Sequence, residues 1–209
     1  MSKGDSIVQV SGSICPTEGF LSMDQHNRRR HARMGAVAAL ATSVMLAAAA
    51  DAGAQQANAQ VERGRYLVTI TGCHDCHSPK IEGMKPDLTR SLSGRPATTA
   101  LPTPTKAEVH ASVDLTAWQG PWGFSVASNL TPDAATGLGN KYTETNFIAT
   151  MRTGKKPNGT PIMPPMPSDV YQNMTDDDLK AIFAYLKTIK PIRNAVYAGL
   201  TPPAETKKP

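Results

Sequence analysis

Apolar residues recur at helical spacing in three separate segments beyond residue 60. In the first, residues 61–71, one face is formed by small and apolar residues at positions 64, 67, 68 and 71. A set of residues three and four apart lies on one side of a helix, so this spacing predicts a short helix. A second helix is predicted from Thr143 as N-cap to Gly154 just past the C-terminus, with Phe147, Ile148 and Met151 as its apolar residues.

The clearest helix is predicted over residues 175–189. Thr175 suits an N-cap, and the three aspartates that follow favour the positive end of a helix dipole. Met174 and Leu179 occupy the two positions of a hydrophobic staple. An apolar stripe follows and consists of Ile182, Tyr185, Leu186 and Ile189, and Pro191 ends the helix. Because Gly64 has no side chain, we expect the first helix to cross closely over this one.

No segment shows the sustained alternation of apolar and polar residues that is typical of a strand. We therefore predict an all-α domain of three to five helices. Only 5% of the residues are aromatic, and ten of the eleven aromatic residues lie beyond residue 59. A core with so few large side chains leaves room for a bulky apolar cofactor.

The first 59 residues have the layout of a leader. A basic segment at residues 28–33 precedes an uncharged, alanine-rich segment from Met34 to Ala50, and two A-x-A cleavage sites follow, ending at Ala54 and Ala59. This order is typical of a signal peptide, with a core over about residues 23–59, and predicts cleavage after Ala54 or Ala59. An uncleaved membrane anchor is the alternative, although 17 residues is short for a membrane span.

This layout predicts three parts of the chain: a leader over 1–59, one domain over 60–196, and a C-terminal tail over 197–209. The leader holds five of the 22 basic and four of the 17 acidic residues, so the remainder carries a net charge of +4. The sequence after the leader contains no concentrated run of Lys and Arg, so we do not expect nucleic acid to be a partner.

The chemistry of the chain is concentrated at residues 73–77, whose sequence is Cys-His-Asp-Cys-His. A chance match to C-x-x-C-H is expected roughly once in a thousand chains of this composition. Two thiols at this spacing can add to the two vinyl groups of one haem, and the following His77 can then ligate the iron. We predict one haem c attached through Cys73 and Cys76.

Other uses of a cysteine pair fit less well. A thioredoxin-like pair follows a strand, whereas here a helical segment precedes it. A zinc site needs a second pair of ligands, and Cys15 is the only other cysteine and falls in the leader. A plain disulfide leaves His77 unexplained. We interpret His74 as a residue on the solvent side, and His110, in a region rich in Pro and Thr, as a surface residue.

The chain resembles class I c-type cytochromes, and more closely the single-haem domains that serve as electron-transfer subunits of bacterial periplasmic dehydrogenases. The matching stretches are residues 63–68, 72–79, 128–133, 136–139 and 163–186. The resemblance implies a cytochrome c fold wrapped around the haem. It also implies a methionine as the second axial ligand, in a Pro-flanked loop before the last helix. By the family register this is Met166, with Met163 as the rival.

Residues 80–127 match the family least and are rich in Pro, Thr, Ser and Gly. We interpret them as a long insertion loop that covers a haem edge or meets a partner. Trp118 and Trp122 are candidates to donate indole N–H bonds to a haem propionate, and packing is the alternative role for both.

Ligation by His and Met fills both axial positions of the iron and favours outer-sphere electron transfer over catalysis. We therefore expect a periplasmic electron carrier, not an enzyme in itself, that connects a dehydrogenase to an oxidase or another cytochrome. Two alternatives remain: a haem peroxidase or gas sensor with a labile sixth ligand, and a membrane-anchored subunit of a larger complex.

Overall fold

The computed structural model describes residues 45, 48–102 and 108–197. Most of the predicted signal peptide, Cys15 and nearly all of the predicted tail lie outside these residues. From Ala54 onwards the chain forms one compact unit. Within the described part of the chain, no helix combines the length and the apolar character that a membrane crossing requires.

A helix occupies residues 48–70, so the predicted helix is confirmed and begins earlier than the apolar pattern suggested. We call its part within the compact unit, residues 54–70, the N-terminal helix. Gly64 lies directly against the last helix, because a Cβ at this position would be 1.9 Å from the carbonyl oxygen of Ala181. The close crossing expected from the sequence is therefore confirmed, and it depends on the missing side chain.

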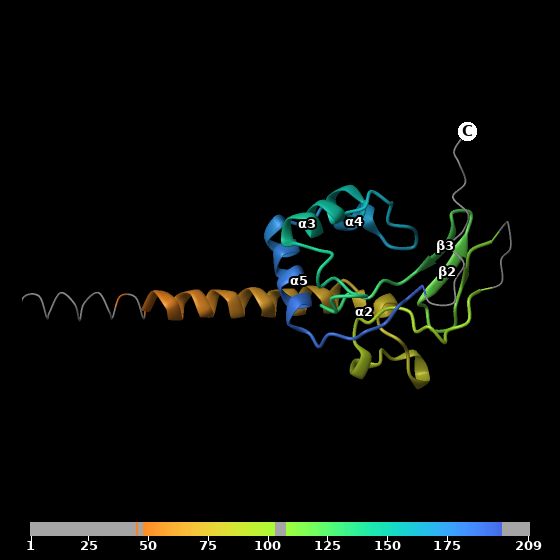
Figure 1. Ribbon diagram of the computed structural model, residues 1–209, viewed down its shortest axis with the longest axis horizontal. Coiled ribbons are helices and arrows are strands. Elements are labelled where there is room, and N and C mark those ends of the chain that lie inside the picture. The colour runs from red at the N-terminus through yellow and green to blue at the C-terminus, as the bar shows by residue number, and fades with distance from the viewer. Residues whose placement is uncertain (1–44, 46–47, 103–107, 198–209) are drawn as a thin grey trace, which may run out of the picture. The chain divides into compact units, whose positions relative to one another are not determined.

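Beyond the N-terminal helix the described chain contains four α-helices and two 3-10 turns. They are α2 (Cys73–His77), η1 (Glu82–Met84), η2 (Leu88–Arg90), α3 (Glu144–Thr153), α4 (Ser168–Tyr171) and α5 (Asp176–Thr188). The predicted caps are present: the side chains of Thr143 and Thr175 accept backbone N–H bonds at the starts of α3 and α5, and Gly154 ends α3. Figure 1 shows α3 and α5 next to each other, with α4 close to α3.

The main core lies where the N-terminal helix, α3 and α5 meet. Its buried side chains include Leu67, Val68, Leu138, Phe147, Met151, Leu179, Ile182, Phe183 and Leu186. The rings of Phe147 and Phe183 pack with centroids 5.2 Å apart. The apolar stripes read from the sequence therefore face one another, and they fix the helical frame around the site.

The domain is not all-α. Within the 80–127 segment lies a three-stranded antiparallel sheet of β1 (His110–Ala111), β2 (Ala117–Gly120) and β3 (Gly123–Val126), in the order β1-β2-β3. Its strands are two to four residues long, too short for an alternating pattern to emerge. The all-α prediction is wrong for this segment, which is a structured insertion and not a loop throughout.

The segment after α5, residues 189–197, runs back to the insertion and ties it to the rest of the domain; we call it the C-terminal strap. The amide of Asn194 donates to the carbonyls of Ser93 (2.7 Å) and Arg95 (2.8 Å). Val196 packs with Ala117 and Val126 in a second small core. The strap thus positions the sheet that forms one wall of the site.

Candidate functional site

A cavity of about 840 Å³ lies between the haem motif, the sheet and the residues before α5. This volume is within the range of cofactor pockets. Most of its lining is apolar and comes from segments far apart in the sequence: Trp118, Phe124, Val126, Leu130, Leu138, Phe147, Met151, Ile162, Met163, Met166, Ile182, Leu186, Val196. Such a lining suits a large apolar ligand.

Cys73 and Cys76 line this cavity from α2, as the sequence predicts. Both are free thiols, so they do not form the disulfide that was one alternative reading. Burial raises the pKa of both thiols. Both thiols therefore stay protonated at neutral pH, and they lie on the wall of the apolar cavity.

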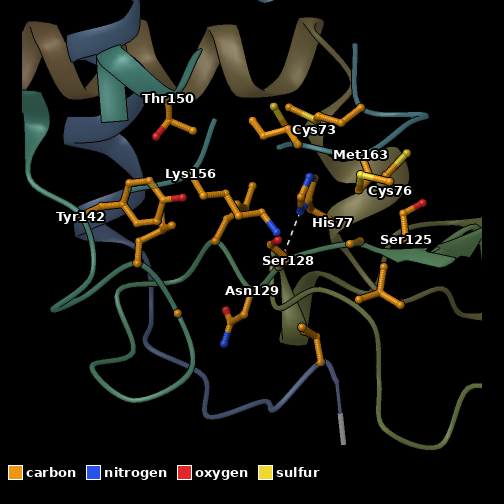
Figure 2. Close-up of a pocket in the computed structure, with 18 of the residues that line it drawn as sticks. Cys73, Cys76, His77, Ser125, Ser128, Asn129, Tyr142, Thr150, Lys156 and Met163 are labelled. Atoms are coloured by element: carbon orange, nitrogen blue, oxygen red, sulfur yellow. Dashed lines mark hydrogen bonds between the residues drawn. The ribbon is translucent and has the colours of Figure 1, made fainter. Parts of the chain in front are cut away.

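His77 is held in one orientation at the end of α2. Its Nδ1 lies 2.8 Å from the carbonyl oxygen of Ser128, and Figure 2 shows this bond. A carbonyl can only accept, so Nδ1 carries the proton and Nε2 keeps its lone pair for a metal. Burial lowers the pKa of His77, and the bond to Ser128 opposes that shift only in part. The imidazole is therefore neutral, which is the state that ligates iron.

The carbonyl of Ser128 is held in place by the next residue. Asn129 is 3% exposed; its Oδ1 accepts from the N–H of Thr131 at 3.0 Å, and its Nδ2 donates to the carbonyl of Ile192 in the C-terminal strap at 2.7 Å. The sequence pointed to residues 128–133 only as a matching stretch. Within this stretch, the support of His77 comes from the backbone carbonyl of Ser128, and no pattern of side chains indicates such a contact.

The loop over residues 161–167, which we call the Met loop, closes another side of the cavity. Met163 and Met166 both line it. Met166 also packs against the main core, and Figure 2 draws Met163 among the lining residues. The structure therefore brings both candidate sulfur ligands to the cavity of His77 and leaves the choice between them open.

Three contacts hold the Met loop. The N–H of Ile162 donates to the carbonyl of Gly154 at 2.7 Å, and the hydroxyl of Ser125 in β3 donates to the carbonyl of Pro164. Just beyond the loop, the hydroxyl of Tyr171 donates to the carbonyl of Thr71, 2.7 Å away and two residues before Cys73. The last two contacts were not predicted, because they join residues 39 and 100 positions apart.

The two tryptophans of the insertion have different positions. Trp118 is 8% exposed and lines the cavity from β2. Trp122 is not among the lining residues, and its Nε1 donates to the hydroxyl of Ser125 at 3.3 Å. Contact with a propionate stays a prediction for both residues.

The remaining histidines of the domain lie outside the cavity lining. His74 is half-buried, and its Nδ1 lies 3.0 Å from the hydroxyl of Ser78 and 3.4 Å from that of Ser91. His74 is therefore not directed into the cavity, and it links the haem motif to the turn after η2. His110 lies in β1, 3.4 Å from the carboxylate of Glu108.

Comparison with known proteins identifies the family. The family model for cytochrome c matches residues 61–190, which include the haem motif, most of the residues that line the cavity, and the last helix. The chain belongs to the cytochrome c family. This cytochrome c is similar to the gluconate 2-dehydrogenase cytochrome c subunit of Pantoea cypripedii, with 32% identity over 151 residues. That alignment covers 72% of this chain and 28% of the relative.

Two further relatives are also cytochrome subunits. The fructose dehydrogenase cytochrome subunit of Gluconobacter japonicus is 29% identical, over 63% of this cytochrome c and 22% of the relative. The alcohol dehydrogenase (quinone) cytochrome c subunit of Gluconobacter oxydans is 28% identical, over 74% of this chain and 27% of the relative. The chain thus spans roughly a quarter of the length of each of these relatives.

The family implies haem c as the cofactor, and the residues of this cytochrome c fit it. His77 turns an unprotonated nitrogen towards an apolar cavity that is also lined by two thiols and by four thioethers, two of them in the Met loop. Imidazole and thioether are the ligand types that hold haem iron in cytochromes c, and paired thiols at C-x-x-C-H spacing are its covalent attachment points.

Proposed function

We propose that this protein carries a single haem c, joined by thioether bonds to Cys73 and Cys76 and ligated through its iron by His77 and Met166. The observation that carries the proposal is the convergence on one cavity of the haem motif, the oriented imidazole and the Met loop. Met166 is preferred over Met163 because it has the position of the ligand in the family register and also packs against the main core.

The chain's own residues prepare this site before any ligand arrives. The carbonyl of Ser128 fixes the tautomer and direction of His77, and the apolar walls would limit the contact of a bound haem with water. The prolines of the Met loop restrict its backbone, which helps to hold a weak thioether ligand. When bound, the haem supplies a centre that gains and loses one electron, and His/Met ligation raises its reduction potential.

We further propose that the protein is a periplasmic electron-transfer subunit that accepts electrons from a dehydrogenase and delivers them to a respiratory acceptor. The names of the relatives support a dehydrogenase as the donor. The order of charged and apolar residues in the leader supports export. Two axial protein ligands leave no iron position for a substrate, which favours a carrier over a peroxidase or a gas sensor.

Spectra of the protein produced with a haem-maturation system test the cofactor and its ligands. We expect haem that acid–acetone does not extract, and a weak long-wavelength absorption band from Met-ligated ferric iron. Substitution of both Cys73 and Cys76 by Ala should abolish the covalent attachment. Haem that stays covalently bound in this double variant would refute the assignment of the cysteines.

The two methionines form a matched pair for assigning the sixth ligand. Met166→Ala should remove the long-wavelength band and lower the reduction potential, whereas Met163→Ala should keep the band. The opposite result would transfer the ligand role to Met163. Binding of CO at neutral pH to the intact protein, or peroxidase activity, would instead support an open or labile sixth position.

The dehydrogenase partner is tested by mixing. The ferric protein should be reduced when a gluconate, fructose or alcohol dehydrogenase that lacks its own cytochrome subunit is supplied with its substrate. The same mixture without substrate is the control. Failure with all three enzymes would argue against this class of donor.

A separate experiment tests the leader. Recovery of the protein in the membrane fraction of the cells that produce it would support a retained leader that acts as an anchor.

A further inference from the structure

The sheet of the insertion touches the loop that carries the proposed sixth ligand. The hydroxyl of Ser125 in β3 donates a hydrogen bond to the carbonyl of Pro164, which lies between Met163 and Met166 in the chain. We propose that Ser125 is a positioning residue that holds the Met loop closed over the haem cavity. This inference rests on the proposed function, because it concerns the loop that supplies the methionine.

The Met loop needs such a partner because it can form few backbone bonds of its own. Four of its seven residues are prolines, which have no N–H. The N–H of Ile162 is used at the start of the loop, and that of Met166 bonds weakly to the carbonyl of Met163 at 3.3 Å. The loop therefore cannot form a ladder of backbone bonds, and a donor from outside it holds the carbonyl of Pro164.

The hydroxyl of Ser125 is itself oriented by a neighbour in the same hairpin. The indole N–H of Trp122 donates to its oxygen at 3.3 Å. With that donor on the oxygen, the single hydroxyl hydrogen is directed to Pro164. The indole ring can lie there because Gly120 has no side chain; a Cβ at Gly120 would be 2.6 Å from the ring of Trp122.

This chain of two bonds gives the insertion a function inside the molecule. It connects the hairpin, in which Gly120 pairs with Gly123, to the loop that lines the same cavity as His77. Figure 2 draws Ser125 and Met163 on the lining of the same cavity. The hairpin thus acts on the equilibrium between a bound and a released methionine.

The expected change in imidazole affinity follows from the net contribution of one hydrogen bond to stability. Loss of the bond from Ser125 shifts the equilibrium between bound and released methionine by roughly two- to tenfold. An external ligand such as imidazole binds only when the methionine is released, so its apparent affinity rises with the released fraction. Ser125→Ala should therefore bind imidazole roughly two- to tenfold more tightly.

The experiment compares four haem-loaded variants with the wild type by imidazole titration of the ferric protein, by the long-wavelength Met–iron band and by reduction potential. Ser125→Ala should bind imidazole more tightly, weaken the band and lower the potential, while Ser125→Thr, which keeps the hydroxyl, should resemble the wild type. Trp122→Phe, which removes only the donor to Ser125, should change all three measurements in the same direction by less. Thr188→Ala is the matched control, because it removes a hydroxyl–carbonyl bond of 2.8 Å within α5.

The results separate this inference from the proposed function. If Met166→Ala or Met163→Ala removes the band but Ser125→Ala matches the Thr188→Ala control in all three measurements, Ser125 has no positioning role. If neither methionine variant changes the band or the imidazole affinity, the Met loop does not supply the ligand and the proposed ligation fails. Unchanged covalent haem content and circular dichroism in Ser125→Ala show that the comparison is made on folded protein.

Discussion

The crossing of the N-terminal helix and α5 at Gly64 makes a quantitative prediction. In Gly64→Ala the new Cβ would lie 1.9 Å from the carbonyl oxygen of Ala181 and 2.8 Å from the Cβ of Tyr185. Cβ atoms essentially never approach other atoms closer than 3.0 Å, so the two helices must move apart by about 1 Å. No side-chain rotation relieves the contact, because the atom in the way belongs to the backbone.

Two opposing effects decide the outcome. Alanine favours a helix interior over glycine by about 1 kcal/mol. Overpacking costs roughly 1–3 kcal/mol, and a gap approaching 1 Å forfeits about a quarter to a half of the dispersion energy of the contacts it opens. Because the obstructing atom belongs to the backbone, and Leu67 and Val68 are buried in the same core, we take the upper end of this cost, about 3 kcal/mol. After subtraction of the gain in helix propensity, the net loss of stability is about 2 kcal/mol. For a domain of this size that lowers the Tm by roughly 4–8 °C.

Thermal unfolding of the haem-loaded protein, followed by far-ultraviolet circular dichroism, measures this difference. Thr69→Ala is the matched control, because Thr69 is exposed on the same helix and its hydroxyl donates to the carbonyl of Arg65 within that helix. We expect its Tm to stay within about 2 °C of the wild type. A Gly64→Ala protein that melts at or above the control would refute the close crossing of the two helices.

Two further predictions concern single contacts. Tyr171→Phe removes the 2.7 Å bond to the carbonyl of Thr71 and should lower the free energy of unfolding by about 1 kcal/mol, or the Tm by roughly 2–4 °C. Tyr66→Phe, at an exposed tyrosine, is the control and should change the Tm little. Equal Tm values for the two variants would show that the bond from Tyr171 does not stabilise the fold. Hydrogen bonds from Thr89 and Arg90 lower the pKa of Asp87 to about 2. A depressed carboxyl pKa stabilises the fold above the unfolded pKa, and this contribution is lost as the pH falls through about 2. Asp87→Asn should therefore show a flatter loss of urea stability than the wild type between about pH 5 and pH 2, and parallel curves would argue against it.

The parts of the fold that local sequence determines were predictable. The starts of α3 and α5 follow from Thr143 and Thr175, since an N-cap and the first turn interact within a few residues. The haem motif is equally local, because its five residues are contiguous. The use of Gly64 as a crossing point could also be inferred, since a glycine on an apolar helix face has few other purposes.

The parts that depend on distant contacts were not predictable. The β2–β3 hairpin was missed because Ala117–Gly120 and Gly123–Val126 are four residues each, and their pairing determines which side chains face the cavity. The bond from Ser125 to Pro164 depends on that hairpin, and nothing in either segment alone indicates it. The support of His77 by Ser128 uses a carbonyl, which every residue has, so composition carries no signal for it.

The C-terminal strap makes the cavity sensitive to cleavage near the end of the domain. Its Asn194 donates to the carbonyls of Ser93 and Arg95, and its Val196 packs with Ala117 and Val126. Cleavage directly after α5 would leave the core between the N-terminal helix, α3 and α5 in place but would remove these attachments of the insertion. A protein shortened in this way should keep its helices and lose the support of one cavity wall, so a protease could separate haem retention from helical content.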